Sequence, residues 1–271
     1  MPTPIPSACG LRMRNKPGLT RESCAPKIQD SLASLARRRT NRHRSRQTAG
    51  TIGGTAGIFP DTCRDRKGFK MRNARIVRNT GETQIMIELE LDGKGKAQFG
   101  EGTGIGFFDH MLNAFTRHGL FDLTVDARGD LWVDGHHLVE DTGIVLGDAI
   151  RQAVGDKAGI RRFGYFVLPM DEALVLCSVD LCGRPYFSMQ FDNGRDGFQS
   201  PMVGEFDTQL AKEFFYSISY AAGMNLHFRI LSGENDHHII EGMFKAFGKA
   251  LDQATQKDPR IEDVLSTKGC L

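Results

Sequence analysis

The chain has 271 residues, of which 40% are hydrophobic and 25% are charged, values that are ordinary for a soluble globular protein of one large or two small domains. It contains no run of 18 or more apolar residues, which excludes a transmembrane helix. The six cysteines show neither paired metal-binding spacing nor a dense disulfide framework, so we expect reduced thiols and a cytoplasmic location.

Charge is divided unevenly along the chain, although the net charge is only +2. Residues 1–70 carry 15 Lys and Arg against 4 Asp and Glu, and the remainder carries 20 against 29. Residues 1–70 lack sustained periodicity, so we expect a disordered basic extension. It could contact nucleic acid, it could be a plastid transit peptide, or translation could start at Met71. We favour the start at Met71, because the ordered pattern begins there.

Hydrophobic periodicity after Met71 predicts a mixture of strands and helices. Residues 82–91 alternate with period two, as in a half-buried strand, and residues 107–119 place apolar side chains on one helical stripe. Residues 120–135 indicate two strands joined by a turn at Arg128-Gly129. The remaining predictions are a helix from His136, a strand over 173–181, a helix over 206–223, a strand over 224–231 and a helix over 237–254.

Two of these helices begin with the same motif. HHLVE (136–140) recurs as HHIIE (237–241), and an ungapped comparison of residues 136–153 with 237–254 gives 7 identities in 18 positions. This repetition predicts an internal duplication into two similar α/β halves. We place the halves at residues 71–165 and 166–271.

The HHxxE motif supplies imidazole and carboxylate groups on the first turn of a helix. Because a helix advances about 100° per residue, each histidine can share a face with the glutamate while the two histidines diverge. We therefore expect each pair to serve two metal sites, and each site to draw on both halves. These ligand types suit Mn, Fe or Zn. His110 is a candidate further ligand for the first half, and Glu213 for the second.

Basic and hydroxyl side chains indicate a phosphate site. There is no GxxxxGK[ST] loop and no convincing dinucleotide GxGxxG fingerprint, so ATP and NAD are not implied. Arginine forks can bind phosphate through paired hydrogen bonds, and neighbouring lysines and hydroxyl groups can complete such a clamp. The candidates are Arg162, Arg184, Lys245, Ser266, Thr267 and Lys268.

Motifs between Met71 and Lys268 resemble the imidazoleglycerol-phosphate dehydratase family of histidine biosynthesis. The motifs are RNTGET (78–83), FDHML (108–112), HGLFDL (118–123), DGHHLVED (134–141), GRPYF (183–187), LSGENDHHIIE (231–241), FKAFGKAL (244–251) and STKG (266–269). The resemblance implies a two-layer α/β fold of duplicated halves, each a four-stranded sheet with helices on one face. It also implies a 24-subunit shell of trimers with two Mn²⁺ ions per active site at subunit interfaces, and no nucleic-acid or membrane partner.

The implied reaction is that of a hydro-lyase (EC 4.2.1.19). It eliminates water from D-erythro-imidazole glycerol phosphate to give imidazole acetol phosphate, with the imidazole ring as the electron source. Glu82 is the implied substrate-contacting acid and our first choice of base, with assistance from Glu140 or Glu241. The implied metal ligands are His110, His136, His137, Glu140, His237, His238 and Glu241. The implied substrate contacts are Glu82, His110, Arg117, His118, His136, Arg162, Arg184, His237, Lys245, Ser266, Thr267 and Lys268.

Three questions stay open from the sequence alone. Many family members have histidine at the position of Glu213, so either this carboxylate replaces the imidazole as a ligand or the position is filled otherwise. A dinuclear metal hydrolase would use similar ligands but would release free phosphate. A nucleic-acid-binding protein led by the basic extension would show steep salt-dependent binding that a chain starting at Met71 lacks.

Overall fold

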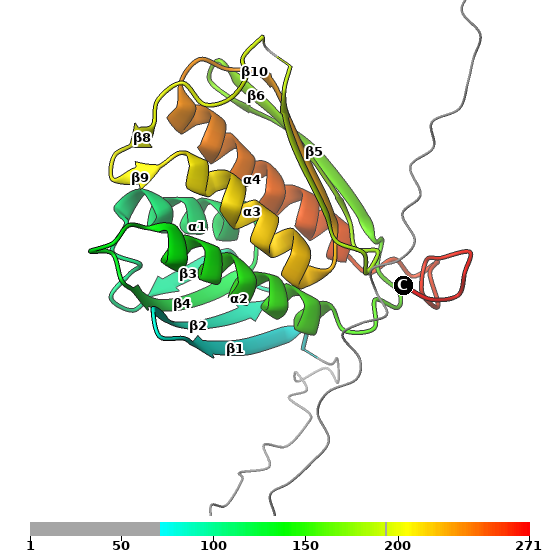
Figure 1. The fold of residues 1–271 in the computed structure, drawn as a ribbon. Helices are drawn as coiled ribbons and strands as arrows, with labels where there is room; N and C mark the ends of the chain where they lie inside the picture. The colour runs from blue at the N-terminus through cyan, green and yellow to red at the C-terminus, as the bar shows by residue number, and fades with distance from the viewer. Residues whose placement is uncertain (1–70, 193) are drawn as a thin grey trace, which may run out of the picture. The chain divides into compact units, whose positions relative to one another are not determined.

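The computed structural model describes residues 71–192 and 194–271, so the expectations for the basic extension lie outside the described residues (Figure 1). The described part of the chain holds two four-stranded sheets with four long helices between them (Figure 1). No helix in this described part is long and apolar enough to span a membrane.

The first sheet has the strand order β1-β2-β4-β3, in which only the β3–β4 pair is parallel. Alternate residues of its central strand, Ile85, Ile87 and Leu89, are buried, which gives the sheet one apolar face for helices to cover. The elements of this half are β1 (Asn73–Asn79), β2 (Thr83–Glu90), β3 (Lys96–Phe99), α1 (Gly106–Gly119), β4 (Asp122–Gly129) and α2 (His136–Val154).

The second sheet repeats this topology in the order β5-β6-β10-β7, again with one parallel pair, β10–β7. The duplication and the four-stranded sheets with helices on one face are therefore confirmed. The elements are β5 (Phe163–Met170), β6 (Ala173–Asp180), β7 (Tyr186–Phe191), β8 (Met202–Val203), β9 (Phe206–Asp207), α3 (Gln209–Ala222), β10 (Asn225–Ser232) and α4 (Asp236–Thr255).

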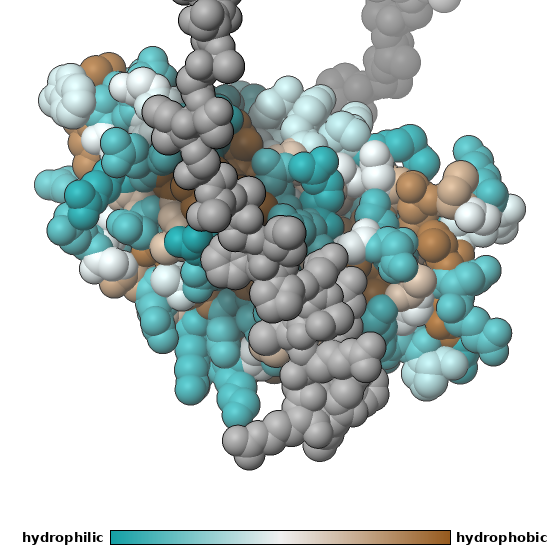
Figure 2. Space-filling view, turned by 90° about the horizontal axis from the view of Figure 1, so that it is seen from below, coloured by the Kyte–Doolittle hydropathy of each residue, from teal (hydrophilic) through white to brown (hydrophobic). Residues whose placement is uncertain are grey.

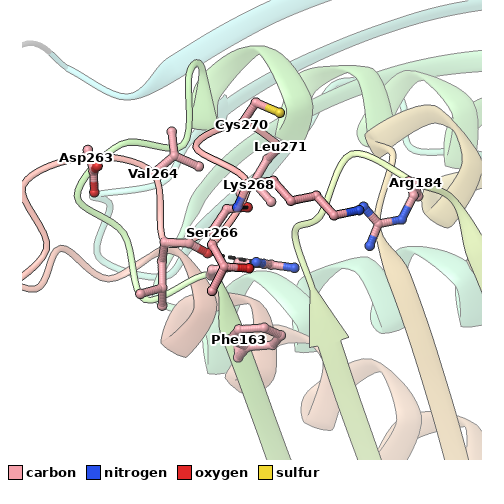
Figure 3. Close-up of a pocket in the computed structure, with 11 residues that line it drawn as sticks. Phe163, Arg184, Asp263, Val264, Ser266, Lys268, Cys270 and Leu271 are labelled. Atoms are coloured by element: carbon pink, nitrogen blue, oxygen red, sulfur yellow. Dashed lines mark hydrogen bonds between the residues drawn. The ribbon is translucent and has the colours of Figure 1, made fainter.

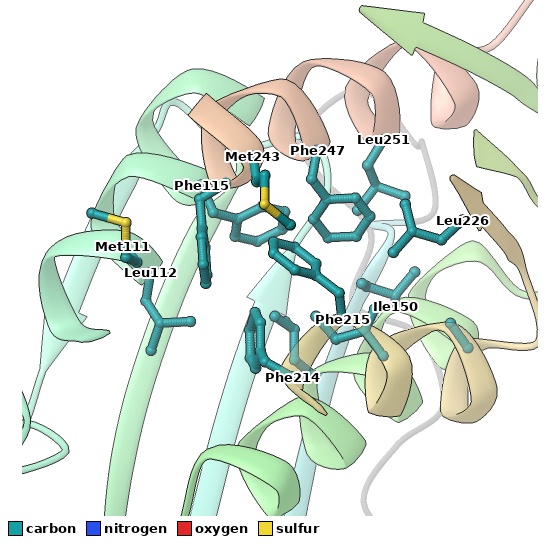
Figure 4. Close-up of a cluster of buried hydrophobic side chains, with 14 of the residues drawn as sticks. Met111, Leu112, Phe115, Ile150, Phe214, Phe215, Leu226, Met243, Phe247 and Leu251 are labelled. Atoms are coloured by element: carbon teal, nitrogen blue, oxygen red, sulfur yellow. The ribbon is translucent and has the colours of Figure 1, made fainter. Parts of the chain in front are cut away.

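The helices of one half pack against the helices of the other: α1 lies against α4, and α2 lies against α3. An aromatic cluster fills the space between them (Figure 4). The rings of Phe115 on α1 and Phe247 on α4 stack with their centroids 5.3 Å apart, and Phe215 of α3 lies 5.6 Å from Phe247. The two halves consequently share one hydrophobic core.

Two glycines allow these helix pairs to approach closely. A Cβ atom on Gly147 of α2 would lie 2.8 Å from the carbonyl oxygen of Ile218, and one on Gly248 of α4 would lie 2.6 Å from that of Phe115. Both distances are shorter than a van der Waals contact. Gly147 and Gly248 occupy matching positions of the sequence repeat, so the repeat preserves the helix contact as well as the HHxxE motif.

The segment 120–135 differs from its prediction as two strands. Only β4 forms, and residues 131–133 make a turn in which the Val133 N–H donates to the Asp130 carbonyl oxygen at 2.8 Å. A second strand would require a half-buried face, but Trp132 is 86% exposed. Helix α3 also begins later than predicted, because Phe206 and Asp207 pair with β8.

The outer surface seen from below in Figure 2 is largely hydrophilic, with hydrophobic side chains in separate areas. Polar pairing on the first sheet fits this view, since Arg75 on β1 and Glu88 on β2 are cross-strand partners whose Nε and Oε1 atoms lie 2.8 Å apart. The apolar side of the sheet therefore faces the helices.

Candidate active site

Both HHxxE motifs begin a helix, and in each the N–H of the first histidine is bonded to a side-chain oxygen two residues earlier, from the N-cap residue Asn235 in α4 and from Asp134, the residue before the N-cap, in α2. The side-chain oxygen of Asp134 accepts a hydrogen bond from the His136 N–H at 2.8 Å, and that of Asn235 accepts one from the His237 N–H at 2.9 Å. Such bonds satisfy amide groups that have no partner within the helix. They fix the backbone position from which each pair of histidine side chains projects.

His110, His237 and Glu241 form a cluster between α1 and α4. The Oε2 atom of Glu241 lies 3.2 Å from Nε2 of His237 and 3.5 Å from Nε2 of His110, and the three residues offer ligand atoms within 4.8 Å of one another. Glu241 is 6% exposed, whereas His110 is exposed. Two imidazoles and one carboxylate at this separation are a donor set that fits Mn²⁺, Fe²⁺ or Zn²⁺.

Lys245 lies one helical turn after Glu241, and its Nζ atom is 2.7 Å from the Oε1 atom of that carboxylate. Burial is the largest single influence on Glu241 and opposes its ionisation. The hydrogen bond and charge of Lys245, with smaller contributions from His110 and His237, outweigh burial and lower the pKa of Glu241. The carboxylate is therefore held in its charged form, which is the form that binds a cation.

A second pair of potential ligands, His136 and Glu140, begins α2, with Nε2 and Oε2 3.6 Å apart. Glu213 comes from the neighbouring helix α3. The charges of Glu213 and Glu140 both raise the pKa of Tyr216, after the larger effect of its hydrogen bond to Tyr220. Glu213 and Glu140 therefore both lie within electrostatic range of Tyr216, and their helices α3 and α2 pack against each other.

This pairing differs from one sequence expectation. We assigned His110 to the first half and Glu213 to the second, but His110 lies beside His237 and Glu241 of the second half. The reason is that α1 packs on α4 and not on α2. The divergence of adjacent histidines is confirmed: the rings of His136 and His137 are 6.2 Å apart and nearly perpendicular, as are those of His237 and His238 at 6.0 Å.

His137 and His238 turn their Nδ1 atoms toward carboxylates that the sequence analysis missed. Nδ1 of His137 is 3.0 Å from Oδ2 of Asp130, and Nδ1 of His238 is 2.8 Å from Oε2 of Glu172. The Asp130 hydrogen bond is the main reason that the pKa of His137 is raised. The Asn235 N–H and then His238 lower the pKa of Glu172 to about 2. A strand-by-strand comparison of the two halves would have found Glu172.

Glu82 lies in the turn between β1 and β2, 3.9 Å from Nδ1 of His137. The Thr80 hydroxyl oxygen accepts hydrogen bonds from the N–H groups of Glu82 and Thr83, at 3.1 and 2.9 Å. The Thr83 hydroxyl donates to Oδ2 of buried Asp141 on α2 at 2.5 Å. The turn that carries Glu82 is thereby fastened to the helix that carries the first HHxxE motif.

Five of the predicted phosphate-binding residues line one cavity of about 560 Å³ at the C-terminal segment (Figure 3). Arg184 extends over the cavity from the side opposite Ser266 and Lys268 (Figure 3). Arg162 is engaged by both carboxylate oxygens of Asp180, at 2.7 and 3.0 Å, and donates to the Leu265 carbonyl oxygen at 2.7 Å. The five residues are Arg162, Arg184, Ser266, Thr267 and Lys268.

The remaining predicted contacts lie on α1. Arg117 is exposed in the last turn of that helix. His118 lies within electrostatic range of Lys245 and Glu241, and its pKa is lowered, first by burial and then by the charge of Lys245. His118 therefore lies near the cluster that contains Glu241 and not near the cavity that Arg184 lines.

The cluster and the cavity lie at opposite ends of α4. His237 is in the first turn of this helix, whereas the Arg162 N–H donates to the carbonyl oxygen of Ala254 near its end at 2.9 Å. A helix rises about 1.5 Å per residue, so the two ends are roughly 25 Å apart. Within one chain the cluster and the cavity are thus too far apart for one small molecule to contact both.

Comparison with known proteins assigns the class of this chain. The profile described as imidazoleglycerol-phosphate dehydratase matches residues 103–251. A protein of that name from Lachnoclostridium phytofermentans is 59% identical over 198 residues, which are 73% of this chain and 97% of the relative. One from Ruminiclostridium cellulolyticum is 58% identical over 201 residues, covering 74% of this chain and all of the relative.

Solved structures agree with this assignment. Imidazoleglycerol-phosphate dehydratase from Staphylococcus aureus superposes with a TM-score of 0.60 at 36% identity, over 69% of this chain and 99% of that one. The Pyrococcus furiosus enzyme superposes with a TM-score of 0.58 at 37% identity, over 72% and 100%. Dehydratases are hydro-lyases, and the family match and the relatives place this chain in that class. The chain belongs to the imidazoleglycerol-phosphate dehydratase family.

Proposed function

We propose that this protein eliminates water from D-erythro-imidazole glycerol phosphate to give imidazole acetol phosphate, in the biosynthesis of histidine, and that it requires Mn²⁺. The observation that carries the proposal is the cluster of His110, His237 and Glu241, whose ligand atoms lie within 4.8 Å of one another in a chain related to dehydratases. We further propose two ions per active site. The second would be held by His136, Glu140 and Glu213, with His137 and His238 completing the two sets.

The side chains divide into three roles in this reaction. Arg184, Ser266 and Lys268 would bind the phosphate, since cations and a hydroxyl group converge on one cavity. Bound Mn²⁺ would supply Lewis-acid chemistry that favours the deprotonated imidazole ring. Glu82 would accept the proton from the carbon adjacent to the one that loses its hydroxyl group, because its carboxylate is exposed and lies beside the ligand set. The enol product then tautomerises to the ketone.

The two parts of the site would meet in an assembly of several copies. The three-carbon chain that joins the ring of this substrate to its phosphate spans roughly 6 Å when extended, which is far shorter than the separation along α4. A cavity from one copy placed against the histidine cluster of another resolves the mismatch. We therefore propose an oligomer with active sites at subunit interfaces, and specifically the 24-subunit shell of trimers. A cytoplasmic location and the absence of nucleic-acid or membrane partners belong to the same proposal.

Metal removal and restoration test the proposed activity. The full chain is stripped with a chelator and assayed for imidazole acetol phosphate and for free phosphate, before and after addition of Mn²⁺. We expect the ketone product only after Mn²⁺ is restored, without release of phosphate. Full turnover by the metal-free protein would refute the metal requirement, and release of phosphate would identify a hydrolase instead.

A further inference from the structure

The second histidine of each HHxxE motif forms a hydrogen bond through its Nδ1 atom to a carboxylate. For His137 the partner of Nδ1 is Asp130 at 3.0 Å, and for His238 it is Glu172 at 2.8 Å. A hydrogen bond from Nδ1–H to a carboxylate fixes the tautomer and the orientation of the ring, and leaves Nε2 free to bind a metal ion. Both halves of the chain therefore use the same device.

The two carboxylates do not occupy matching positions in the duplication. Glu172 lies in the turn before β6, and its counterpart in the first half is Glu82, in the turn before β2. The strand pairing makes Arg128 of the first half equivalent to Ser232 of the second half. Two residues after these positions, the first half has Asp130 and the second half has Glu234. Each half thus carries a carboxylate at both of these matching positions, but the loop residue bonds to the histidine in the first half and the turn residue does so in the second.

Local geometry explains this exchange. In the first half the loop between β4 and α2 turns back on itself, and Asp130 is only 6% exposed beside His137. In the second half the connection to α4 is shorter, and Glu234 is exposed. Glu172 reaches His238 instead, and its Oε1 atom also accepts hydrogen bonds from the N–H groups of Asn235 and Glu234, at 2.8 and 3.3 Å.

We propose that Asp130 and Glu172 are positioning residues that hold His137 and His238 with Nε2 directed to the metal ion, and that Asp130 thereby leaves Glu82 available for the substrate. The proposal rests on the proposed function, because it assigns roles around the same metal site. In the first half the turn carboxylate stays 3.9 Å from the histidine. In the second half Glu172 is engaged by His238 and by two backbone N–H groups.

Four single variants of the full chain test the positioning roles: Asp130→Ala, Glu172→Ala, Glu82→Ala and Glu234→Ala. The measurement is Mn²⁺ affinity of the metal-stripped protein by titration calorimetry, with the Mn²⁺ electron paramagnetic resonance signal as a second readout. Loss of an outer partner weakens metal binding roughly 10–100-fold, and we expect this for the Asp130 and Glu172 variants only. Asp130→Asn and Glu172→Gln should recover part of the affinity, because their amide oxygens still accept a hydrogen bond from Nδ1–H.

Wild-type Mn²⁺ affinity in Glu172→Ala would overturn the proposal, as would an equal loss in Glu234→Ala. Because Asp130 is buried, the thermal midpoint of each metal-free variant is measured as well, and Asp130→Asn replaces the alanine variant if that does not fold. Metal affinity is measured without substrate. A protein that binds Mn²⁺ as expected but does not dehydrate imidazole glycerol phosphate would refute the proposed function and leave the positioning roles intact.

A double variant tests the release of Glu82. When Asp130 is removed, Glu82 is the carboxylate nearest to Nδ1 of His137 and should take over the positioning role. We therefore expect Glu82→Ala to leave Mn²⁺ affinity unchanged in the wild-type background but to lower it further in the Asp130→Asn background, by roughly 10-fold. Equal effects of Glu82→Ala in both backgrounds would show that Asp130 does not free Glu82.

Discussion

The Nε2 atom of His110 on α1 lies 3.5 Å from the Oε2 atom of Glu241 on α4, although the two residues belong to different halves of a duplicated chain. The contact exists because helices of opposite halves pack together in parallel. His110 faces Glu241 near the starts of α1 and α4, and Phe115 faces Gly248 further along both helices. The cluster of His110, His237 and Glu241 therefore combines one helix from each half.

Removal of either His110 or Glu241 should weaken the binding of the same metal ion. We expect His110→Ala and Glu241→Gln each to lower Mn²⁺ affinity by at least the roughly 10–100-fold that loss of an outer partner costs. The double variant should cost less than the sum of the single variants, because both act on one site. Titration calorimetry measures these affinities, with His227→Ala on the exposed face of β10 as the control. Additive losses would place the two residues at different ions.

Glu213 should act as a ligand in place of an imidazole. We expect Glu213→Ala to lose one of the two proposed Mn²⁺ ions, whereas Glu213→His should retain both, since imidazole and carboxylate both suit Mn²⁺. The metal content of purified protein, determined by mass spectrometry, distinguishes the variants. If Glu213→Ala binds as much Mn²⁺ as the wild type, the position is filled otherwise.

Inactive variants at opposite ends of α4 should complement each other. Glu241→Gln disables the metal-type cluster and Arg184→Ala disables the cavity, so each variant alone should be inactive. In a mixed oligomer, random assembly gives about a quarter of the sites an intact cluster from one copy and an intact cavity from another. Co-expression followed by an activity assay tests this expectation. Inactivity of an oligomer shown by mass analysis to be mixed would mean that each chain completes its own site.

Gly248 should be intolerant of a side chain. A Cβ atom there would lie 2.6 Å from the Phe115 carbonyl oxygen, so Gly248→Ala should separate α4 from α1 and lower stability by about 1–3 kcal/mol. Gly106→Ala is the matched control, because nothing lies within 4 Å of a Cβ atom at that helical position. Thermal unfolding compares the two variants. Equal midpoints would mean that the helix pair adjusts without cost.

Periodicity and the repeated motif were sufficient to predict the helix over 107–119, the helix over 237–254 and the duplication, because these features depend on residues close in sequence. The partner of His110 could not be predicted in the same way. An apolar stripe shows which face of α1 is buried, but not which helix covers it. Asp130 and Glu172 were missed for a similar reason, since each meets its histidine only through the path of a loop or the pairing of strands.

The shared aromatic core has a consequence for the unity of the molecule. Phe115 of the first half and Phe215 of the second both pack on Phe247, and Gly147 and Gly248 close the two inter-half helix contacts. A fragment ending after α2 would expose the inner sides of α1 and α2 to water, so neither half is an independent folding unit. Duplication has here produced a single cooperative domain, in which the loss of either copy would dismantle both ligand sets.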